Sequence, residues 1–377
     1  MGFSTDAIHG GQENFSKYRD VIPPIHLATT YDREDIETPG EFSYSRGQNP
    51  VRAAAEENIA LLEKTRHALL FSSGVAAINA VYSLLNPGDH ILISSQIYGG
   101  TYRILKYLNE KYGITHDYFN EADLSDAESK LRPQTRMFYI ETPSNPLFNV
   151  YSLKAASDLA KKHNLISVSD NTFLTPYLQN PAEYGTDIII HSSTKFINGH
   201  SDVIGGVVCV SDSSLSEKLK FLQRSTGAVP SPFDAWLILR SLKTLKVRMD
   251  YHTKSAAAIA DALKSESFVK AVYYPGWKSA VENEIQNSQA RGRGGVISFV
   301  ADENVNLKEA TAKLKIVKVA ESLGGVETIM SQPYNMSHSV IPPSEKNALG
   351  ITKNLLRLSV GLEDTEDIIA DIVQAFR

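Results

Sequence analysis

The chain is poor in cysteine, and this sets the first limit on its chemistry. Cys209 is the only cysteine among 377 residues, so an internal disulfide and a cysteine metal cluster are both impossible. It lies in the apolar run at residues 205–210, which we interpret as a buried strand in which the thiol packs as a small apolar side chain. We therefore expect Cys209 to belong to the core, and we expect no metal site.

Basic clusters and long apolar runs are also missing. The formal net charge is −5, and no block of lysines and arginines concentrates positive charge, so nucleic acid is a poor partner. No apolar run approaches the ~18 residues that a membrane-spanning helix needs. The first ten residues lack the basic-then-apolar pattern of a secretory signal. We expect a cytoplasmic protein with no membrane partner.

What the chain does have is a regular alternation of helical and apolar segments. Helical patterns at residues 53–64, 76–85 and 153–163 alternate with short apolar runs. Those runs lie at residues 68–71, 91–93, 137–140, 165–168 and 187–190. Such alternation is typical of a mostly parallel sheet with crossover helices, and it predicts an α/β fold.

Three segments of different character follow one another along the chain. Residues 1–50 are rich in Pro, Gly, Tyr and Asn without sustained periodicity, and they predict an extended arm that packs on another surface. Residues 51–245 predict the α/β domain. A long helical region at about 234–264 is followed by strand patterns such as 296–300 and 355–360, which predict a smaller α+β domain over 246–377. No flexible linker separates the two domains, so we expect them to dock closely.

Polar residues follow several of the apolar runs, at the sheet edge where an open parallel sheet binds its ligands. Gly74 and Val75 open a helix whose free N–H groups could hold a phosphate. Asn145 stands in a turn stiffened by two prolines. Asp170 places a carboxylate where a heterocyclic cation would be a good partner. Each residue taken alone also suits an ordinary turn or a helix cap.

Lys195 is the strongest single candidate for chemistry. It follows an apolar strand and two hydroxyl residues, so we expect it to be partly buried with a lowered pKa, as an amine nucleophile requires. The letters at 192–195 and 169–171 also spell the Ser-x-x-Lys and Ser-Asp-Asn motifs of β-lactamases. That alternative fails because the sequence contains no Lys-Thr-Gly, the two motifs come in reversed order, and the parallel alternating pattern does not suit that fold.

Seven separated motifs, in the same order, resemble the Cys/Met-metabolism family of enzymes that use pyridoxal phosphate (PLP), such as cystathionine γ-synthase and cystathionine γ-lyase. The resemblance extends over nearly the whole chain and implies the PLP-dependent transferase fold of type I, with amino acids as small-molecule substrates. The motifs are Tyr44-Ser-Arg46 with Asn49-Pro50, Ser73-Gly74, Tyr98-Gly-Gly-Thr101, and the segments 141–146, 169–206, 321–325 and 357–363.

The resemblance implies a role for each residue that matches a family motif. Lys195 would be the Schiff-base lysine and would shuttle protons, and Tyr98 would stack on the PLP ring and assist in proton transfer or leaving-group activation. Asp170 would pair with the pyridine nitrogen, and Asn145 would bond the 3-oxygen. The groups that would hold the phosphate are Gly74, Val75, Ser192 and Thr194, joined by Tyr44 and Arg46 of a neighbouring subunit.

The substrate would be held by a second group of residues that the resemblance also implies. Arg357, helped by Ser322, would bind the α-carboxylate in a bidentate pair. Arg103 would meet a distal carboxylate or a succinyl group, and Glu321 would receive an ammonium group. Because Tyr44 and Arg46 would serve a neighbour, the resemblance further implies a homo-oligomer, a tetramer built from two dimers that share their active sites.

The same motifs narrow the reaction to γ-replacement or γ-elimination in sulfur amino-acid metabolism. Our first prediction is a cystathionine γ-synthase, which joins activated homoserine and cysteine, and the alternative is a cystathionine γ-lyase. Homoserine sulfhydrylase and methionine γ-lyase rank lower. Gly100 stands where methionine γ-lyases carry cysteine, which disfavours the second of these activities. Ser43 and Val51 depart from the family pattern and weaken the substrate assignment. A catalytically silent homologue is disfavoured because Lys195 and Asp170 are both present.

Overall fold

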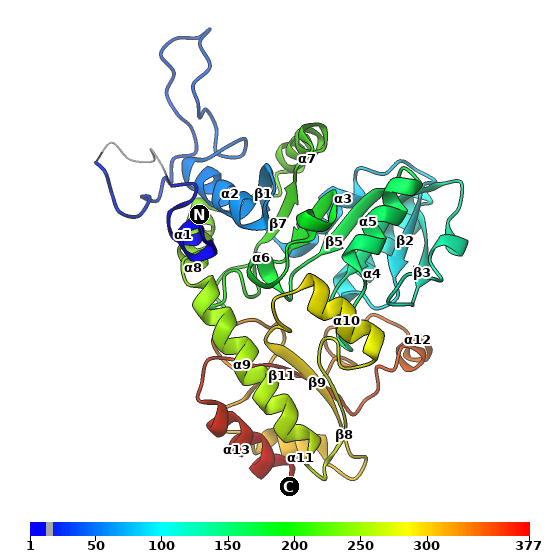
Figure 1. The fold of residues 1–377 in the computed structure, drawn as a ribbon. Coiled ribbons are helices and arrows are strands. Elements are labelled where there is room, and N and C mark those ends of the chain that lie inside the picture. Colours follow the sequence, from blue (N-terminus) through cyan, green and yellow to red (C-terminus); the bar gives the residue numbers. More distant parts are fainter. Residues whose placement is uncertain (13–17) are drawn as a thin grey trace.

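The computed structural model describes residues 1–12 and 18–377. They fold around two β-sheets of different size (Figure 1). The larger sheet has the strand order β1-β7-β6-β5-β4-β2-β3. β7 is antiparallel to both of its neighbours, and the other pairs are parallel, so the predicted mostly parallel sheet is confirmed. The strands are β1 (His67–Phe71), β2 (His90–Ser94), β3 (Thr115–Phe119), β4 (Thr135–Glu141), β5 (Ile166–Asp170), β6 (Ile188–His191) and β7 (Gly206–Val210).

Helices cover both faces of the larger sheet because its central strands are apolar on both sides. One face carries Val168 and Ile190, and the other carries Ile189 and Cys209. Cys209 is fully buried there, which confirms its place in the core. The first face is covered by α3 (Gly74–Tyr82), α4 (Gly99–Tyr112) and α7 (Ser213–Thr226). The second face is covered by α2 (Pro50–Glu63), α5 (Leu153–Lys162), α6 (Thr175–Leu178) and α8 (Pro232–Leu242).

The smaller sheet forms the lower half of the molecule in Figure 1, with the strand order β10-β11-β12-β9-β8. Ile259, Phe299 and Leu358 belong to the core between this sheet and its helices. The strands are β8 (Val269–Tyr273), β9 (Val296–Ala301), β10 (Lys318–Val319), β11 (Ile329–Ser331) and β12 (Leu355–Ser359). The helices of this part are α9 (Leu245–Lys264), α10 (Ala280–Gln289), α11 (Leu307–Ala312), α12 (Pro343–Ala348) and α13 (Thr365–Phe376).

The two halves are joined by a long helical segment and by polar contacts. The single helical region expected at 234–264 is two helices, α8 and α9, which are separated at Lys243 and Thr244. Gln289 of α10 accepts a hydrogen bond from Leu153 N at 2.9 Å and donates one to Tyr151 O at 3.0 Å. The domain limits at 50, 245 and 377 stay a prediction. Among the described residues, no helix is long and apolar enough to cross a membrane.

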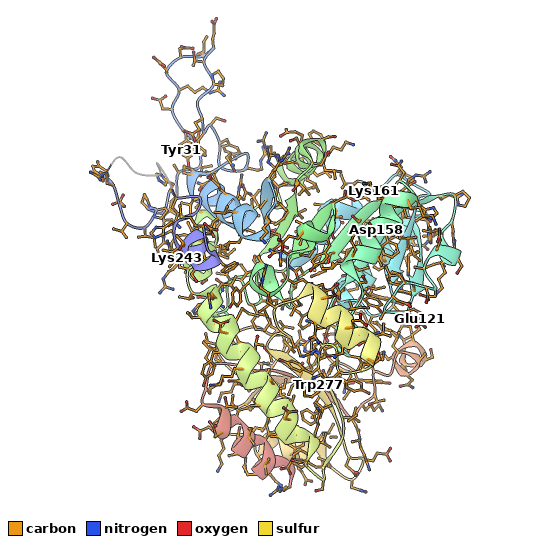
Figure 2. All side chains as sticks on the ribbon, in the orientation of Figure 1. Tyr31, Glu121, Asp158, Lys161, Lys243 and Trp277 are labelled. Atoms are coloured by element: carbon orange, nitrogen blue, oxygen red, sulfur yellow. The ribbon has the colours of Figure 1, made fainter. Side chains whose placement is uncertain are left out.

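The N-terminal segment departs in part from the predicted arm. Residues Phe3–His9 form the helix α1, where no helix was expected. The reason is docking rather than periodicity: the Asn58 side chain of α2 donates to Asp6 O at 3.0 Å and to Gly10 O at 2.7 Å, and Ala7 is buried. Lys243 donates to Ile8 O at 2.6 Å and lies beside α1 in Figure 2. Residues 13–17 of the predicted arm lie outside the described residues.

The rest of the arm projects away from both sheets (Figure 1). Its base is fixed by Asn49, which accepts from Val51 N at 3.0 Å and donates to the Tyr31 hydroxyl at 3.1 Å. Buried Arg52 fixes the end of the arm that precedes α2 by donating to Ser45 O at 3.1 Å and to Gly47 O at 2.6 Å. The arm therefore leaves the body of the protein at a defined point, directly before α2.

Candidate active site

A cavity of about 380 Å³ lies at the carboxyl ends of β4, β5 and β6, where the larger sheet meets residues of the smaller domain. All the predicted site residues except Tyr44 and Arg46 line it. The residues brought together are Gly74, Val75, Tyr98, Arg103, Asn145, Asp170, Ser192, Thr194, Lys195, Glu321, Ser322 and Arg357. Side chains from separate parts of the chain meet because the parallel strands end at one sheet edge.

Lys195 lies in the cavity in the turn that follows β6. Its Nζ donates a hydrogen bond to Ser322 Oγ at 2.7 Å. Burial, and next the charge of Arg357, lower the pKa of Lys195 to about 8, although Glu321 acts in the opposite direction. A lysine with this pKa supplies the uncharged amine near neutral pH, which is the form that attacks a carbonyl group.

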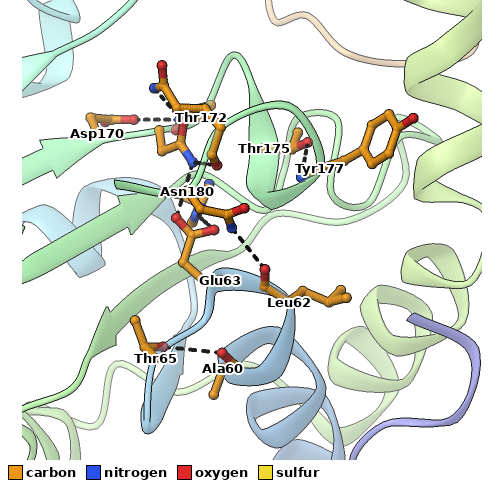
Figure 3. A network of polar contacts seen from close by, with 12 residues as sticks. Ala60, Leu62, Glu63, Thr65, Asp170, Thr172, Thr175, Tyr177 and Asn180 are labelled. Carbon is orange, nitrogen blue, oxygen red and sulfur yellow. Dashed lines mark hydrogen bonds and ion pairs between the residues drawn. The ribbon is translucent and has the colours of Figure 1, made fainter. Parts of the chain in front are cut away.

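Asp170 ends β5 at the floor of the cavity. Its Oδ1 accepts from Thr172 N at 3.0 Å (Figure 3), and its Oδ2 accepts from the Tyr139 hydroxyl at 3.5 Å. Burial raises the pKa of Asp170, against the hydrogen bonds from Thr172 that favour the charged form. Both of these hydrogen-bond partners are neutral, so a protonated pyridine nitrogen fits this position as a charged partner.

The first turn of α3 forms a second end of the cavity. Ser73 caps the helix by accepting from Ala76 N at 3.1 Å. A Cβ on Gly74 would lie 2.9 Å from the Cβ of Ser192, so glycine is needed for this close approach. The free N–H groups and the positive end of the helix dipole suit a phosphate here.

The Ser192–Thr194 turn faces this end, but the two hydroxyl residues differ in their bonding. Ser192 is positioned through its backbone, which donates to Thr172 Oγ1 at 2.9 Å. The Thr194 hydroxyl donates to Gly205 O at 3.1 Å and accepts from Gly205 N at 3.0 Å, so the backbone already engages it. The phosphate-binding roles of Ser192 and Thr194 stay predictions.

Arg357 of β12 is buried and lines the same cavity as Lys195. Its Nη1 donates to Asn145 Oδ1 at 2.8 Å, and its Nη2 donates to Ser322 O at 3.0 Å. Its Nε has no hydrogen-bond partner among the described residues, and burial lowers the pKa of Arg357 to about 10. A buried guanidinium with an unused donor suits the carboxylate of a bound ligand. Since Asn145 Oδ1 is engaged, its amide nitrogen is the group left to donate to a ligand.

Ser322 joins these two basic residues. Its hydroxyl contacts Lys195 and its carbonyl contacts Arg357. Its φ of 83° is unusual for a residue other than glycine. Such backbone strain is concentrated at functional sites, where surrounding contacts hold it in place.

Sequence reasoning missed Glu141 as a site residue, although it begins one of the motifs. Glu141 is the last residue of β4 and lines the cavity. Its carboxylate accepts from Tyr98 N at 2.9 Å and from Asn145 N at 3.1 Å. The signal is present in the sequence, because a charged residue ends an apolar run, four residues before Asn145 in the same motif.

Tyr44 and Arg46 lie in the arm, outside the cavity of their own chain. Tyr44 is 45% exposed, and the Arg46 guanidinium stands 5.4 Å from the centre of its ring. Arg46 Nη1 also donates to Arg224 O at 2.7 Å. Their service to a neighbouring subunit stays a prediction, and their exposure leaves them accessible for it.

The model of the Cys/Met metabolism PLP-dependent enzymes matches residues 4–377. The chain belongs to this family. It is 43% identical to the cystathionine β-lyase of Lactococcus lactis subsp. cremoris (strain MG1363) over 98% of each chain. It is 41% identical to the cystathionine γ-lyase of Bacillus subtilis (strain 168), over 100% of this chain and 99% of the relative.

Solved structures of the family superpose on nearly the whole chain. A cystathionine γ-lyase from Lactobacillus plantarum, complexed with L-serine, has a TM-score of 0.95 at 39% identity and covers 100% of this chain and 98% of its own. A cystathionine γ-synthase from Xanthomonas oryzae pv. oryzae, in complex with aminoacrylate and cysteine, has a TM-score of 0.95 at 34% identity, with the same two coverages. The predicted family, type I fold, PLP cofactor and enzyme class are confirmed.

The described geometry suits PLP in this cavity. When bound, PLP supplies an electron sink for a carbanion at the substrate's α-carbon. Three parts of the site suit three groups of PLP. The Lys195 amine suits its aldehyde, the Asp170 carboxylate suits its pyridine nitrogen, and the N–H groups at the start of α3 suit its phosphate. Asn145 and Tyr98 line the cavity between these parts. The assignment of individual residues to parts of the cofactor remains our proposal.

Asp170→Asn provides a test of one such assignment. The variant should still bind PLP, but its kcat should fall by roughly 10²- to 10⁴-fold, because a neutral amide does not hold the pyridine nitrogen protonated. Steady-state kinetics and PLP titration of the cofactor-free protein measure the two quantities. Unchanged kcat in this variant would remove Asp170 from the site.

Proposed function

We propose that the protein is a carbon–sulfur lyase that cleaves cystathionine at its γ-carbon. The observation that carries this proposal is the set of charged groups lining one cavity with Lys195, namely Arg357, Arg103 and Glu321. Cystathionine carries an amino-acid group at each end, so it offers two carboxylates and two ammonium groups. Two arginines and one carboxylate beside a reactive lysine match a substrate of this kind.

Each residue has a defined task in this proposal. Arg357 binds the α-carboxylate of the end that reacts, and Arg103 and Glu321 receive the carboxylate and ammonium of the distal end. Lys195 Nζ takes the proton from the α-carbon and moves it along the substrate, while Tyr98 assists departure of the sulfur. The overall reaction is cystathionine plus water giving cysteine, 2-oxobutanoate and ammonia.

The direction of the reaction is the finer part of the proposal. The two relatives described above carry the names of lyases, and this supports cleavage. The synthase that the sequence analysis placed first is not confirmed, and it stays the second candidate because a γ-synthase is among the similar structures. Arg103 and Glu321 would serve that reaction as well, by receiving a succinyl group and the amine of cysteine. A cytoplasmic homotetramer also remains part of the proposal.

A parallel assay separates these reactions. The purified protein is incubated with cystathionine alone, and in separate vessels with cysteine and O-succinyl-, O-acetyl- or O-phosphohomoserine. We expect cysteine and 2-oxobutanoate from cystathionine. Pyruvate and homocysteine would instead identify a β-lyase, and cystathionine formed only from an activated homoserine would identify a γ-synthase. Either result overturns the proposed direction.

Arg103→Ala tests the distal end of the substrate site. Loss of a charged hydrogen bond should raise KM for cystathionine by about tenfold, with a much smaller change for an O-acetylhomoserine substrate that lacks the distal amino-acid group. Arg136→Ala serves as the control, because Arg136 is 53% exposed and lies 3.8 Å from Asp89, away from the cavity. Equal KM changes for both substrates would mean that Arg103 does not bind the distal end of cystathionine.

A further inference from the structure

Glu141 lines the active-site cavity, and the proposed reaction gives it no task. It pairs in register with Asp170, so two carboxyl groups end adjacent strands at the same sheet edge. Its side chain is 3% exposed. Burial, and next the charge of Asp170, hold the pKa of Glu141 well above its usual value. Placing a second buried carboxyl beside Asp170 is unfavourable by itself, so its presence indicates a compensating contact.

The contacts of Glu141 are with the backbones of two ligand-facing residues. Oε2 accepts from Tyr98 N at 2.9 Å, and Oε1 accepts from Asn145 N at 3.1 Å. The Asn145 turn has few other donors of this kind, because its neighbours Pro143 and Pro146 have no N–H group. One side chain therefore ties the segment before α4 to the turn after β4.

The hydrogen bonds of Asn145 extend this link to residues of the smaller domain. Asn145 Oδ1 accepts from Arg357 Nη1 at 2.8 Å, and Asn145 O is bonded to His338 Nε2 at 3.2 Å. A continuous set of hydrogen bonds thus runs from Tyr98 through Glu141 and Asn145 to Arg357. Tyr98, assigned to the cofactor ring, and Arg357, assigned to the substrate carboxylate, are therefore linked by one hydrogen-bond network.

We propose that Glu141 is a positioning residue that sets the placement of Tyr98 and Asn145 for the reaction. This inference rests on the proposed roles of those two residues. Both carboxylate oxygens of Glu141 are engaged by backbone N–H groups, so it acts through Tyr98 and Asn145 rather than on the substrate. When these bonds are lost, both segments are free to shift, and displacements of about 1 Å are enough to cost roughly 10²-fold in rate.

Glu141→Gln separates this role from a structural one. The variant keeps the size of the side chain and one acceptor oxygen, but it turns an NH₂ donor toward a backbone N–H group and cannot become negatively charged beside Asp170. We expect the thermal midpoint of the cofactor-free protein to stay unchanged or to rise, since like-charge repulsion is relieved. At the same time kcat should fall by roughly 10- to 100-fold, and the circular dichroism band of bound PLP should change.

Two further variants sharpen the test. Glu141→Asp restores the charge but is one methylene shorter, so it reaches one N–H group and should give an intermediate kcat. Asp371→Asn is the matched control: Asp371 accepts from the backbone N–H groups of Ile316 and Val317 at 2.8 and 2.9 Å in the smaller domain. This control should lower the thermal midpoint and leave both kcat per folded molecule and the PLP band unchanged.

The outcomes are distinguishable from failure of the proposed function. The circular dichroism band and the PLP affinity are measured without substrate, so they report on Glu141 even if the natural substrate is another amino acid. A folded Glu141→Gln protein with unchanged kcat and an unchanged PLP band would overturn the proposal. So would an activity loss that only follows a loss of folded protein, because that result assigns Glu141 a structural role.

Discussion

Replacing Lys195 with alanine is expected to abolish turnover while leaving the protein folded. In our proposal the amine is the covalent partner of the cofactor and the base at the α-carbon, so its removal should eliminate the covalent step and at least about 10³-fold of proton-transfer catalysis. The sheet should be unaffected, because Lys195 lies in a turn after β6 and its side chain hydrogen-bonds only to Ser322 among the described residues. Product formation from cystathionine and thermal unfolding of the cofactor-free protein provide the two measurements.

A second partly buried lysine offers a matched control for this variant. Burial also lowers the pKa of Lys243, whose Nζ donates to Ile8 O and to Gln12 Oε1 at 2.6 Å, far along the chain from the cavity residues. Lys243→Ala should retain turnover. The thermal midpoint of cofactor-free Lys195→Ala should change by no more than about 5 °C. Full-rate γ-elimination in Lys195→Ala would refute the assigned role.

The residues at the strand ends are the part of the site that could be predicted from the sequence. Apolar runs identified β4, β5 and β6, and the rule that ligands lie beyond the carboxyl ends of parallel strands brought Asn145, Asp170 and Lys195 into one cavity. This worked because those strands are almost entirely buried and each contains apolar residues that form a recognisable run. Strong local patterns of this kind do not depend on distant contacts.

Other elements depend on tertiary contacts and gave no such pattern. β3 is Thr115–Phe119, at the sheet edge, where its side chains are mostly half-buried and polar, so no apolar run marked it. α1 is held by Asn58 rather than by its own periodicity. The contact of Arg357 with Asn145 joins residues 212 positions apart, which no local reading could supply. The family motifs implied both residues, but not that they touch.

The position of the arm raises the question of which site Arg46 serves. Within its own chain, Arg46 contacts the Arg224 carbonyl and the Tyr44 ring, and it does not line the cavity. Its motif nevertheless matches phosphate ligands of the family. If both facts hold, each cavity is completed by the arm of a neighbour, and an active protein requires at least two chains.

Mixing two inactive variants distinguishes this arrangement from one in which Arg46 serves its own chain. Arg46→Ala should weaken PLP binding and thereby abolish activity, whereas Arg33→Ala, elsewhere in the exposed arm, should do neither. In a hybrid dimer of Arg46→Ala with Lys195→Ala, the cavity with an intact Lys195 receives an intact arm. Random exchange makes half of the dimers hybrid with one complete site each, so roughly a quarter of the wild-type activity should return.

An arrangement in which Arg46 serves its own chain predicts a different result for the mixture. If Arg46 served the cavity of its own chain, the two inactive parents would stay inactive in every combination, because each cavity would lack either Arg46 or Lys195. Subunit exchange must therefore be shown independently, for example by native mass spectrometry of the mixture. With exchange demonstrated, an inactive mixture would exclude the shared site. Restored activity would show that the exposed arm before α2 completes the active site of a partner, since no other combination of these two variants contains an intact site.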